Sequence, residues 1–290
     1  MIKCIATDMD GTLLGADQTI SEENKKAILA AQEAGITVVI STGRSFDGAS
    51  FPVNEASLNM PIICMNGAQT YTNKGEVLSS VGIPHHTYKE IMSILDAADC
   101  YYELYTSEGQ FSTDMDKALS TIADIIFSSG KFTDYEEVLT GVKKRFVNSN
   151  IQFIDHYNTI LEREAIEFYK VLAFSTDKEK LTTIENNLKN VHDIAVSSSG
   201  FENLEINSIH AQKGLAVERF VTSNGIQLAE TMAIGDSYND VSMLQKAGFA
   251  VAMGNAPDDI KALCHYVTAT NVDNGFAEAV YKVIEMNKES

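Results

Sequence analysis

The sequence predicts an α/β fold in which a parallel-sheet core is interrupted by a second, α+β domain. Strand and helix patterns alternate at the start of the chain and again at its end, as they do in βαβ units around a parallel sheet. The segment between them is richer in Tyr and Phe, and it shows a hairpin-like alternation at residues 101–112. The two ends of the chain are therefore expected to form halves of one sheet.

The N-terminal half of the core begins with an apolar run, Ile2–Thr7, that predicts a strand. Ser21, followed by two glutamates, is the expected N-cap of the first helix, and Gly35 is its expected C-terminal stop. The next elements along the chain are expected to be a strand at 36–40, a helix after Arg44 and a strand at 62–65.

The C-terminal half repeats this alternation after the middle segment. Helices are expected at 213–224 and 240–247, and strands at 231–234 and 249–252. The expected core domain covers residues 1–83 and 209–290, and the inserted domain covers residues 84–208 and is entered near Pro84. Within the insert, a helix is expected at 178–189 and a strand at 204–207.

Composition excludes several classes of partner. The 290 residues carry a net charge of −18, from 40 acidic and 22 basic side chains, which disfavours nucleic acid and anionic membranes. No apolar run approaches transmembrane length, and the N-terminus lacks the pattern of a signal peptide. The four cysteines are far apart and form no CxxC pair, which favours a reducing, cytoplasmic setting. We expect a monomer or a weak homo-oligomer.

Two carboxylates follow the first predicted strand, in the run Asp8-Met9-Asp10-Gly11-Thr12. In open α/β sheets, ligands bind at the carboxyl ends of the strands. Asp8 is the candidate nucleophile, which would form an aspartyl-phosphate, and Asp10 is the candidate acid and base. By itself, an acidic turn that caps a helix or stays solvated explains this motif equally well.

Three further loops offer groups suited to phosphate or to a metal. Thr42 and Gly43 follow the second strand and could hold phosphate oxygens. Lys213 opens a helix after the predicted strand 204–207 and could neutralise the charge of the nucleophile. Asp236, Asn239 and Asp240 follow the strand at 231–234 and offer the hard oxygen ligands that Mg²⁺ prefers. Each loop alone is ordinary, but four such loops at successive strand ends indicate one site.

The runs DMDGTLL, STGR, Lys213-Gly214 and GDSYND, in this order, resemble the four motifs of the haloacid dehalogenase superfamily of phosphatases. The NGA run at 66–68 and the tail VAMGNAPDDIKALCHYVTATNVDNGFAEAV are similar to its Cof-type branch, which hydrolyses sugar phosphates and related metabolites. This resemblance implies a Rossmann-like core and identifies the insert as a cap of the C2B type, where the substrate-selecting residues are expected.

Carried over to this chain, the resemblance implies a role for each motif residue. Asp8, the Asp10 carbonyl and Asp236 are the implied Mg²⁺ ligands, with Asp240 in or beside the metal shell. The implied phosphoryl-oxygen ligands are Thr42, Gly43, Lys213 and Asn239, together with backbone donors near Met9 and Thr42. Asn255, in MGNA, lies where the family has a structural or substrate-side turn.

The expected activity is Mg²⁺-dependent hydrolysis of a small phosphorylated metabolite, such as a sugar phosphate. A phosphotransferase or phosphomutase uses the same two aspartates, although the large insert favours hydrolysis. A non-catalytic phosphoryl-receiver or binding module also has an acidic pocket and a lysine, but it normally lacks the second carboxylate and the insert.

Overall fold

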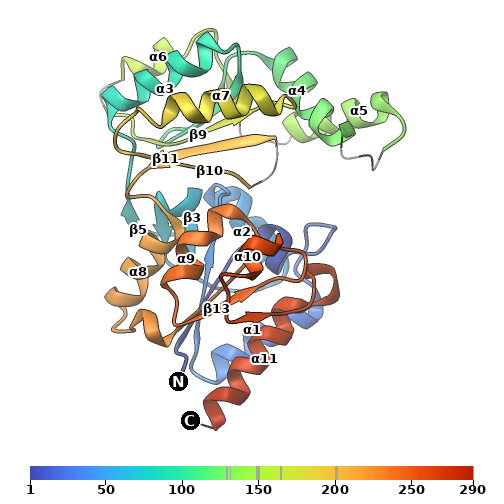
Figure 1. Cartoon of the computed structure of the whole chain (residues 1–290), viewed down its shortest axis with the longest axis vertical. Coiled ribbons are helices and arrows are strands. Elements are labelled where there is room, and N and C mark those ends of the chain that lie inside the picture. Colours follow the sequence, from blue (N-terminus) through green and yellow to red (C-terminus); the bar gives the residue numbers. More distant parts are fainter. Residues whose placement is uncertain (129, 131, 148–150, 164, 200–201, 290) are drawn as a thin grey trace. The chain divides into compact units, whose positions relative to one another are not determined.

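A computed structural model describes residues 1–128, 130, 132–147, 151–163, 165–199 and 202–289. The chain divides into two compact units (Figure 1). Unit 1 comprises Met1–Val81 and Ala211–Ser290, and unit 2 comprises Gly82–His210. The expected insert, 84–208, includes residues 129, 131, 148–150, 164, 200 and 201, which lie outside the described residues.

Unit 1 contains an eight-stranded sheet in the order β14-β13-β12-β1-β2-β3-β4-β5. Its six strands from β14 to β3 are parallel, whereas β4 and β5 are antiparallel to their neighbours. The bounds are β1 Cys4–Thr7, β2 Thr37–Ser41, β3 Ile62–Cys64, β4 Gln69–Tyr71, β5 Val77–Ser80, β12 Thr231–Gly235, β13 Phe249–Ala252 and β14 Tyr266–Val267. The parallel-sheet core expected from the alternation is therefore confirmed.

Helices cover both faces of this sheet (Figure 1). They are α1 Glu22–Glu33, α2 Phe46–Glu55, α8 Lys213–Ser223, α9 Val241–Lys246, α10 Asp258–Lys261 and α11 Gly275–Lys288. Helices α1 and α11 pack against each other, while α8 and α9 bury Val217, Phe220 and Leu244 against the other face of β1 and its neighbours. Because both faces are covered, β1 is buried along its whole length, which explains its continuous apolar run.

Local signals account for the bounds of α1. The Ser21 hydroxyl accepts a hydrogen bond from the Asn24 N–H at 3.1 Å, which caps the helix as expected. The chain leaves the helix through Gly35 at φ +76°, a left-handed conformation that favours glycine.

The strand order places a topological switch point at β1. The chain passes from β1 to β2 on one side and returns later through β12 on the other side. Register pairs Thr7 with Ile40 in β2 and with Ile234 in β12, so the three strands end at the same level. In open α/β sheets, ligands bind beyond the carboxyl ends of the strands at such a switch point.

Unit 2 is an α+β domain with a six-stranded sheet in the order β10-β11-β9-β6-β7-β8. The pairings are antiparallel except for β7 with β8. Its strands are β6 Tyr101–Thr106, β7 Gly109–Ser112, β8 Ile151–Phe153, β9 Phe168–Phe174, β10 Ile194–Ser197 and β11 Asn203–Ser208. Its helices are α3 His85–Ala97, α4 Met115–Ser128, α5 Tyr135–Val147, α6 Asn158–Leu161 and α7 Lys178–Leu188.

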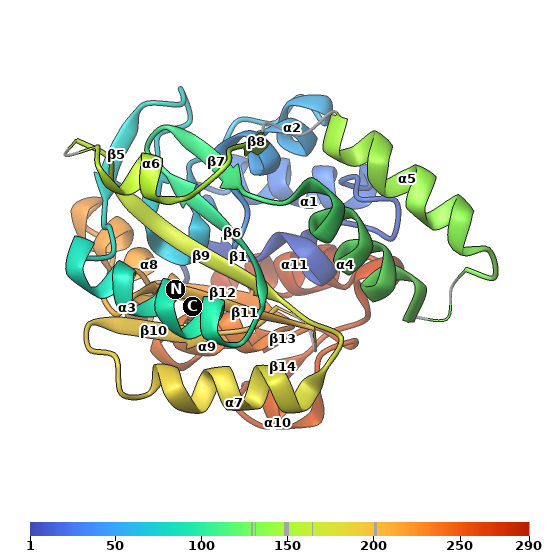
Figure 2. The same ribbon diagram turned by 90° about the horizontal axis from the view of Figure 1, so that it is seen from above.

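Two apolar clusters hold unit 2 together. The larger one lies between the sheet and α3, α6 and α7, and it includes Leu95, Ile160, Ile184 and Val171. Helices α4 and α5 lie side by side in Figures 1 and 2 and form the smaller cluster.

The strand expected within the insert lies in unit 2. The predicted strand at 204–207 is β11, which pairs with β9 and β10 in the sheet of unit 2. Lys213 therefore does not follow a strand of the core sheet; it is the first residue of α8.

Among the described residues, no helix is long and apolar enough to span a membrane.

Candidate active site

The loop after β1 begins with Asp8, whose backbone N–H donates to the Ile234 carbonyl of β12 at 3.0 Å. The chain then turns through Gly11, at φ +73°. A Cβ on Gly11 would lie 2.3 Å from Asp236 Oδ2, well inside contact distance. Both the conformation and the space therefore require glycine at this position, which brings the loop after β1 against the loop after β12.

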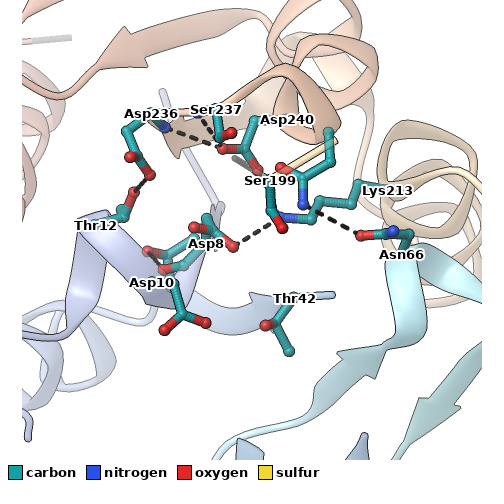
Figure 3. A network of polar contacts seen from close by, with 12 residues as sticks. Asp8, Asp10, Thr12, Thr42, Asn66, Ser199, Lys213, Asp236, Ser237 and Asp240 are labelled. Atoms are coloured by element: carbon teal, nitrogen blue, oxygen red, sulfur yellow. Dashed lines mark hydrogen bonds and ion pairs between the residues drawn. The ribbon is translucent and has the colours of Figure 1, made fainter. Parts of the chain in front are cut away.

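A buried lysine joins two of the predicted site aspartates (Figure 3). Lys213 Nζ lies 2.6 Å from Asp8 Oδ1 and 2.6 Å from Asp240 Oδ1. Burial alone would lower the pKa of Lys213, but the charges of Asp240 and Asp8 raise it above its ordinary value. Lys213 is therefore a permanent cation at the nucleophile candidate.

The surroundings of Asp8 disfavour its ionised form. Burial raises the pKa of Asp8 well above its ordinary value, and the nearby charge of Asp240 raises it further, whereas Lys213 acts in the opposite direction. A second positive charge beside Asp8 would favour the ionised, nucleophilic form.

Asp240 is held by donors on both of its oxygens. Oδ1 accepts from Lys213, and Oδ2 accepts from the backbone N–H groups of Asp236 and Ser237, each at 2.9 Å. The side chain is fully buried. Asp240 thus fixes the loop after β12 and holds Lys213 in place.

Asp236 faces Asp8 from the loop after β12. Its Oδ1 accepts from the Thr12 hydroxyl at 2.9 Å, and its Oδ2 accepts from the Asn255 amide at 3.2 Å. Burial and then the charge of Asp240 raise the pKa of Asp236 to about 7, although the Thr12 hydrogen bond lowers it.

Three carboxylates converge here, and we call Asp8, Asp236 and Asp240 the acidic cluster. One oxygen from each lies within 4.8 Å of the others. Hard carboxylate oxygens at this spacing suit a divalent cation such as Mg²⁺. The raised pKa values of Asp8 and Asp236 also favour a bound cation, because the negative charges of the acidic cluster repel one another. The residues present therefore fit a divalent metal.

Asp10 lies at the site but makes a different contact. Its carboxylate forms a two-pronged ion pair with Arg44, at 2.5 Å to Nη2 and 2.7 Å to Nε. Arg44 Nη2 also donates to Gln18, and Nη1 donates to the Gly48 carbonyl at 3.1 Å. Arg44 thus orients the second carboxylate of the DMD motif, a role that sequence reasoning did not assign.

The residues expected to hold phosphoryl oxygens come from three loops of unit 1. Thr42 is buried at the end of β2, and its carbonyl accepts from the Asn66 N–H at 2.9 Å. Asn239 Nδ2 donates to Asn66 Oδ1 at 3.4 Å, and among the described residues Asn239 Oδ1 has no hydrogen-bond partner. Met9 is fully buried beside Asp8, and Gly43 directly follows Thr42.

Asn66 links two of these loops through strained backbone. Met65 has φ +49° and Asn66 has φ +57°, both in the left-handed region. Such strain persists only where surrounding contacts hold it, and it is concentrated at functional sites. The signal in the sequence was the NGA run, which did not show that Asn66 joins Thr42 to Asn239.

The fold and the site together define an α/β enzyme with a carboxylate nucleophile candidate at the switch point of a parallel sheet. The chain belongs to the haloacid dehalogenase-like hydrolase family, whose model matches residues 5–280. The resemblance to this superfamily and its Cof-type branch is confirmed.

Known relatives extend over nearly the whole chain. Phosphatase YwpJ of Bacillus subtilis is 34% identical over 95% of this chain and 98% of its own length. The 5-amino-6-(5-phospho-D-ribitylamino)uracil phosphatase YwtE of the same organism is 35% identical over 95% and 96%. A solved haloacid dehalogenase-like hydrolase from B. subtilis is 33% identical, with a TM-score of 0.87 over 97% of this chain and 99% of that one. The chain is therefore a phosphatase, a phosphoric monoester hydrolase.

Proposed function

We propose that this phosphatase hydrolyses a small phosphorylated metabolite through a phosphoryl group carried on Asp8, with Mg²⁺ as its metal. The observation that carries the proposal is the contact of Asp8 with Lys213 at 2.6 Å inside a buried acidic cluster. A carboxylate attacks an anionic phosphate only when nearby positive charge offsets their repulsion. Lys213 supplies part of that charge.

Mg²⁺ would be held by Asp8, by Asp236 and by the backbone carbonyl of Asp10. Bound there, it would supply the remaining positive charge that screens the nucleophile and the phosphoryl oxygens. Asp240 was also a candidate ligand. Its two oxygens already accept three hydrogen bonds, so we assign it the task of holding Lys213 and the Asp236 loop.

Asp8 and Asp10 have different tasks in the proposed reaction. An oxygen of Asp8 forms a bond to phosphorus as the bond from phosphorus to the leaving oxygen breaks, and Asp10 gives its proton to that oxygen. Asp10 then takes a proton from the water that attacks phosphorus, which releases phosphate and restores the Asp8 carboxylate. Arg44 keeps the Asp10 carboxylate oriented between these steps.

Hydrogen-bond donors around the phosphoryl group complete the site. We assign this task to the Thr42 hydroxyl, to backbone N–H groups at Met9 and Gly43, to Lys213 and to the Asn239 amide. Asn239 Nδ2 donates one N–H to Asn66 Oδ1 at 3.4 Å, and its second N–H can donate to a phosphoryl oxygen.

Charge and the name of a relative support the proposed substrate class. Nothing in a chain of net charge −18 favours a polyanion such as nucleic acid. The relative YwtE is named for a phosphorylated ribityl compound, which supports a phosphorylated sugar or sugar alcohol as substrate. The four free cysteines are compatible with activity in the cytoplasm.

A burst experiment with 4-nitrophenyl phosphate and Mg²⁺ tests the proposal. The nitrophenolate leaving group needs little help from an acid, so Asp10→Asn should still phosphorylate Asp8. Release of phosphate then needs Asp10 as base and should slow by about 10²–10⁴-fold. We expect one equivalent of nitrophenolate per enzyme and a phosphopeptide that contains Asp8.

Asp8→Asn is the matched control, because it keeps the shape of the side chain and removes the nucleophile. It should show neither burst nor turnover. Wild-type rates in Asp8→Asn, or phosphate found on another residue, would overturn the assignment. If labelled phosphate moves from the enzyme to a second sugar and not to water, the chain is a phosphotransferase.

A further inference from the structure

Asn255 makes two contacts that join separate loops of the site. It follows β13 by three residues, and its side-chain amide donates to the Gly11 carbonyl at 2.9 Å and to Asp236 Oδ2 at 3.2 Å. Gly11 belongs to the loop after β1, and Asp236 belongs to the loop after β12. One amide group therefore connects the loop of the nucleophile to a carboxylate of the acidic cluster.

The orientation of this amide is fixed from its other end. Asn255 Oδ1 accepts a hydrogen bond from the Asn271 backbone N–H at 3.1 Å. A backbone N–H can only donate, so the carbonyl end must face Asn271 and the NH₂ end must face Gly11 and Asp236. Asn271 is anchored in turn, because its amide donates to the Leu14 carbonyl at 2.8 Å.

The Asp236 carboxylate is consequently held at both oxygens. Thr12 donates to Oδ1, and Asn255 donates to Oδ2. Two donors on opposite oxygens prevent the carboxylate from rotating, yet a carboxylate oxygen has more than one lone pair, so each can accept a further partner. This is the arrangement that outer-shell hydrogen bonds give to a ligating carboxylate.

We propose that Asn255 is a positioning residue of the metal site, which holds Asp236 at the angle that a divalent cation requires. The inference rests on the proposed function, because it assumes that Asp236 is a metal ligand. Asn255 also ties that ligand to the Gly11 carbonyl, so the distance between the loop after β1 and Asp236 is fixed. Loss of the amide should lower the affinity for the metal, and its effect on the stability of the fold should be smaller.

The test measures metal binding directly, without turnover. Free Mn²⁺, a spectroscopic substitute for Mg²⁺, is followed by electron paramagnetic resonance as it is titrated with full-length wild-type protein and with Asn255→Ala. We expect the Kd for Mn²⁺ to rise by about 10–100-fold in Asn255→Ala, the range found when outer-shell partners are removed. Thr12→Val, which removes the donor to the other oxygen, should raise the Kd in the same direction.

Asn224→Ala is the matched control for the loss of an asparagine amide. Asn224 Nδ2 donates to the Phe220 carbonyl at 2.8 Å, at the end of α8 and outside the site, so its removal should leave the Kd for Mn²⁺ unchanged. Thermal unfolding in EDTA measures what each variant loses in stability alone. If Asn255→Ala does not fold, Asn255→Ser takes its place.

Two outcomes separate the inference from the function on which it rests. A wild-type protein that binds no Mn²⁺ overturns the metal assignment in the proposed function, and the inference with it. A wild-type protein that binds Mn²⁺ and an Asn255 variant that binds it equally well overturn only the inference. In that second case Asn255 merely fastens a loop, and its variants lose thermal stability alone.

Discussion

At the scale of single residues, the site is organised around Lys213. Its side chain has no solvent exposure and lies between two carboxylates that are distant in the sequence. The desolvation of a buried lysine is unfavourable, so its two ion pairs must be intact for the charge to be tolerated. The same side chain therefore serves both the proposed catalysis and the stability of unit 1.

Removing this cation should be costly for the fold. In Lys213→Met, two buried carboxylates lose their common partner, and the free energy of unfolding in EDTA should fall by about 3–5 kcal/mol. Urea denaturation checks this. Lys246→Met is the control, because Lys246 pairs with Glu218 on the surface at 2.7 Å and should contribute at most about 1 kcal/mol. Equal losses in the two variants would contradict the buried role of Lys213.

The acidic cluster predicts a pH dependence of metal binding. The pKa of Asp236 is raised to about 7, above its value of about 3.9 in the unfolded chain. Between these values the metal-free folded state holds the extra proton, so the free energy of unfolding falls as pH rises from about 4 to about 7. A metal must displace that proton, so its affinity rises over the same range.

Calorimetric titration with Mg²⁺ at several pH values measures this linkage. We expect the Kd to fall as pH rises toward 7, by up to about tenfold per pH unit for each proton that Asp236 or Asp8 releases. A Kd that does not change between pH 5.5 and 7.5 would show that Asp236 is not protonated in the metal-free protein.

At the scale of elements, the loop after β1 decides whether the cluster forms. Gly11 turns the chain at φ +73° and leaves room for the Asp236 carboxylate beside its Cα. A side chain at this position would meet Asp236 Oδ2 at 2.3 Å. The Gly11 turn and the Asp236 carboxylate are thus packed against each other.

A pair of glycine variants separates backbone strain from this packing. Gly11→Ala and Gly35→Ala both place alanine in the left-handed region, and each should cost about 1–2 kcal/mol of stability. A Cβ at Gly35 would meet nothing within 4 Å, so only Gly11→Ala should also displace Asp236 and weaken Mg²⁺ binding by more than about tenfold. Titration and urea denaturation of both variants check this, and similar Mg²⁺ affinities would contradict it.

At the scale of the whole molecule, the residues assigned to the reaction are separate in the chain from the insert. Every residue assigned to the reaction lies in unit 1, and unit 2 is one continuous insert, Gly82–His210. Within unit 2, Tyr102 has a structural role, because it is buried in the core and its hydroxyl donates to Asp96 at 2.8 Å. We propose that other parts of unit 2 act as the cap that selects the substrate.

Exchange of the insert tests this division. Residues 82–210 are replaced by the corresponding segment of phosphatase YwpJ, and the chimera is compared with both parents on a panel of sugar phosphates, nucleotides and cofactor phosphates with Mg²⁺. The ranking of kcat/KM should follow the insert, because the reacting groups of unit 1 are retained. A ranking that stays with unit 1 would refute selection by the insert.

Much of the fold was predictable because its signals are local. Ser21 and Gly35 mark the ends of α1 through a cap and a left-handed turn, and both depend on only a few neighbouring residues. The strand at 204–207 was predicted within the insert, but its partners β9 and β10 were not, because pairing partners are set by the packing of the whole unit. Strand order is a property of the folded chain.

The sequence by itself determined the alternation of elements and the acidic motifs at the ends of the core strands, since periodicity and turn chemistry act over a few residues. Only the tertiary structure decided which of those side chains meet. Asn255 contacts Gly11, 244 residues away, and Arg44 rather than Lys213 pairs with Asp10. Such partners follow from which strand ends lie side by side, and no local pattern records that arrangement.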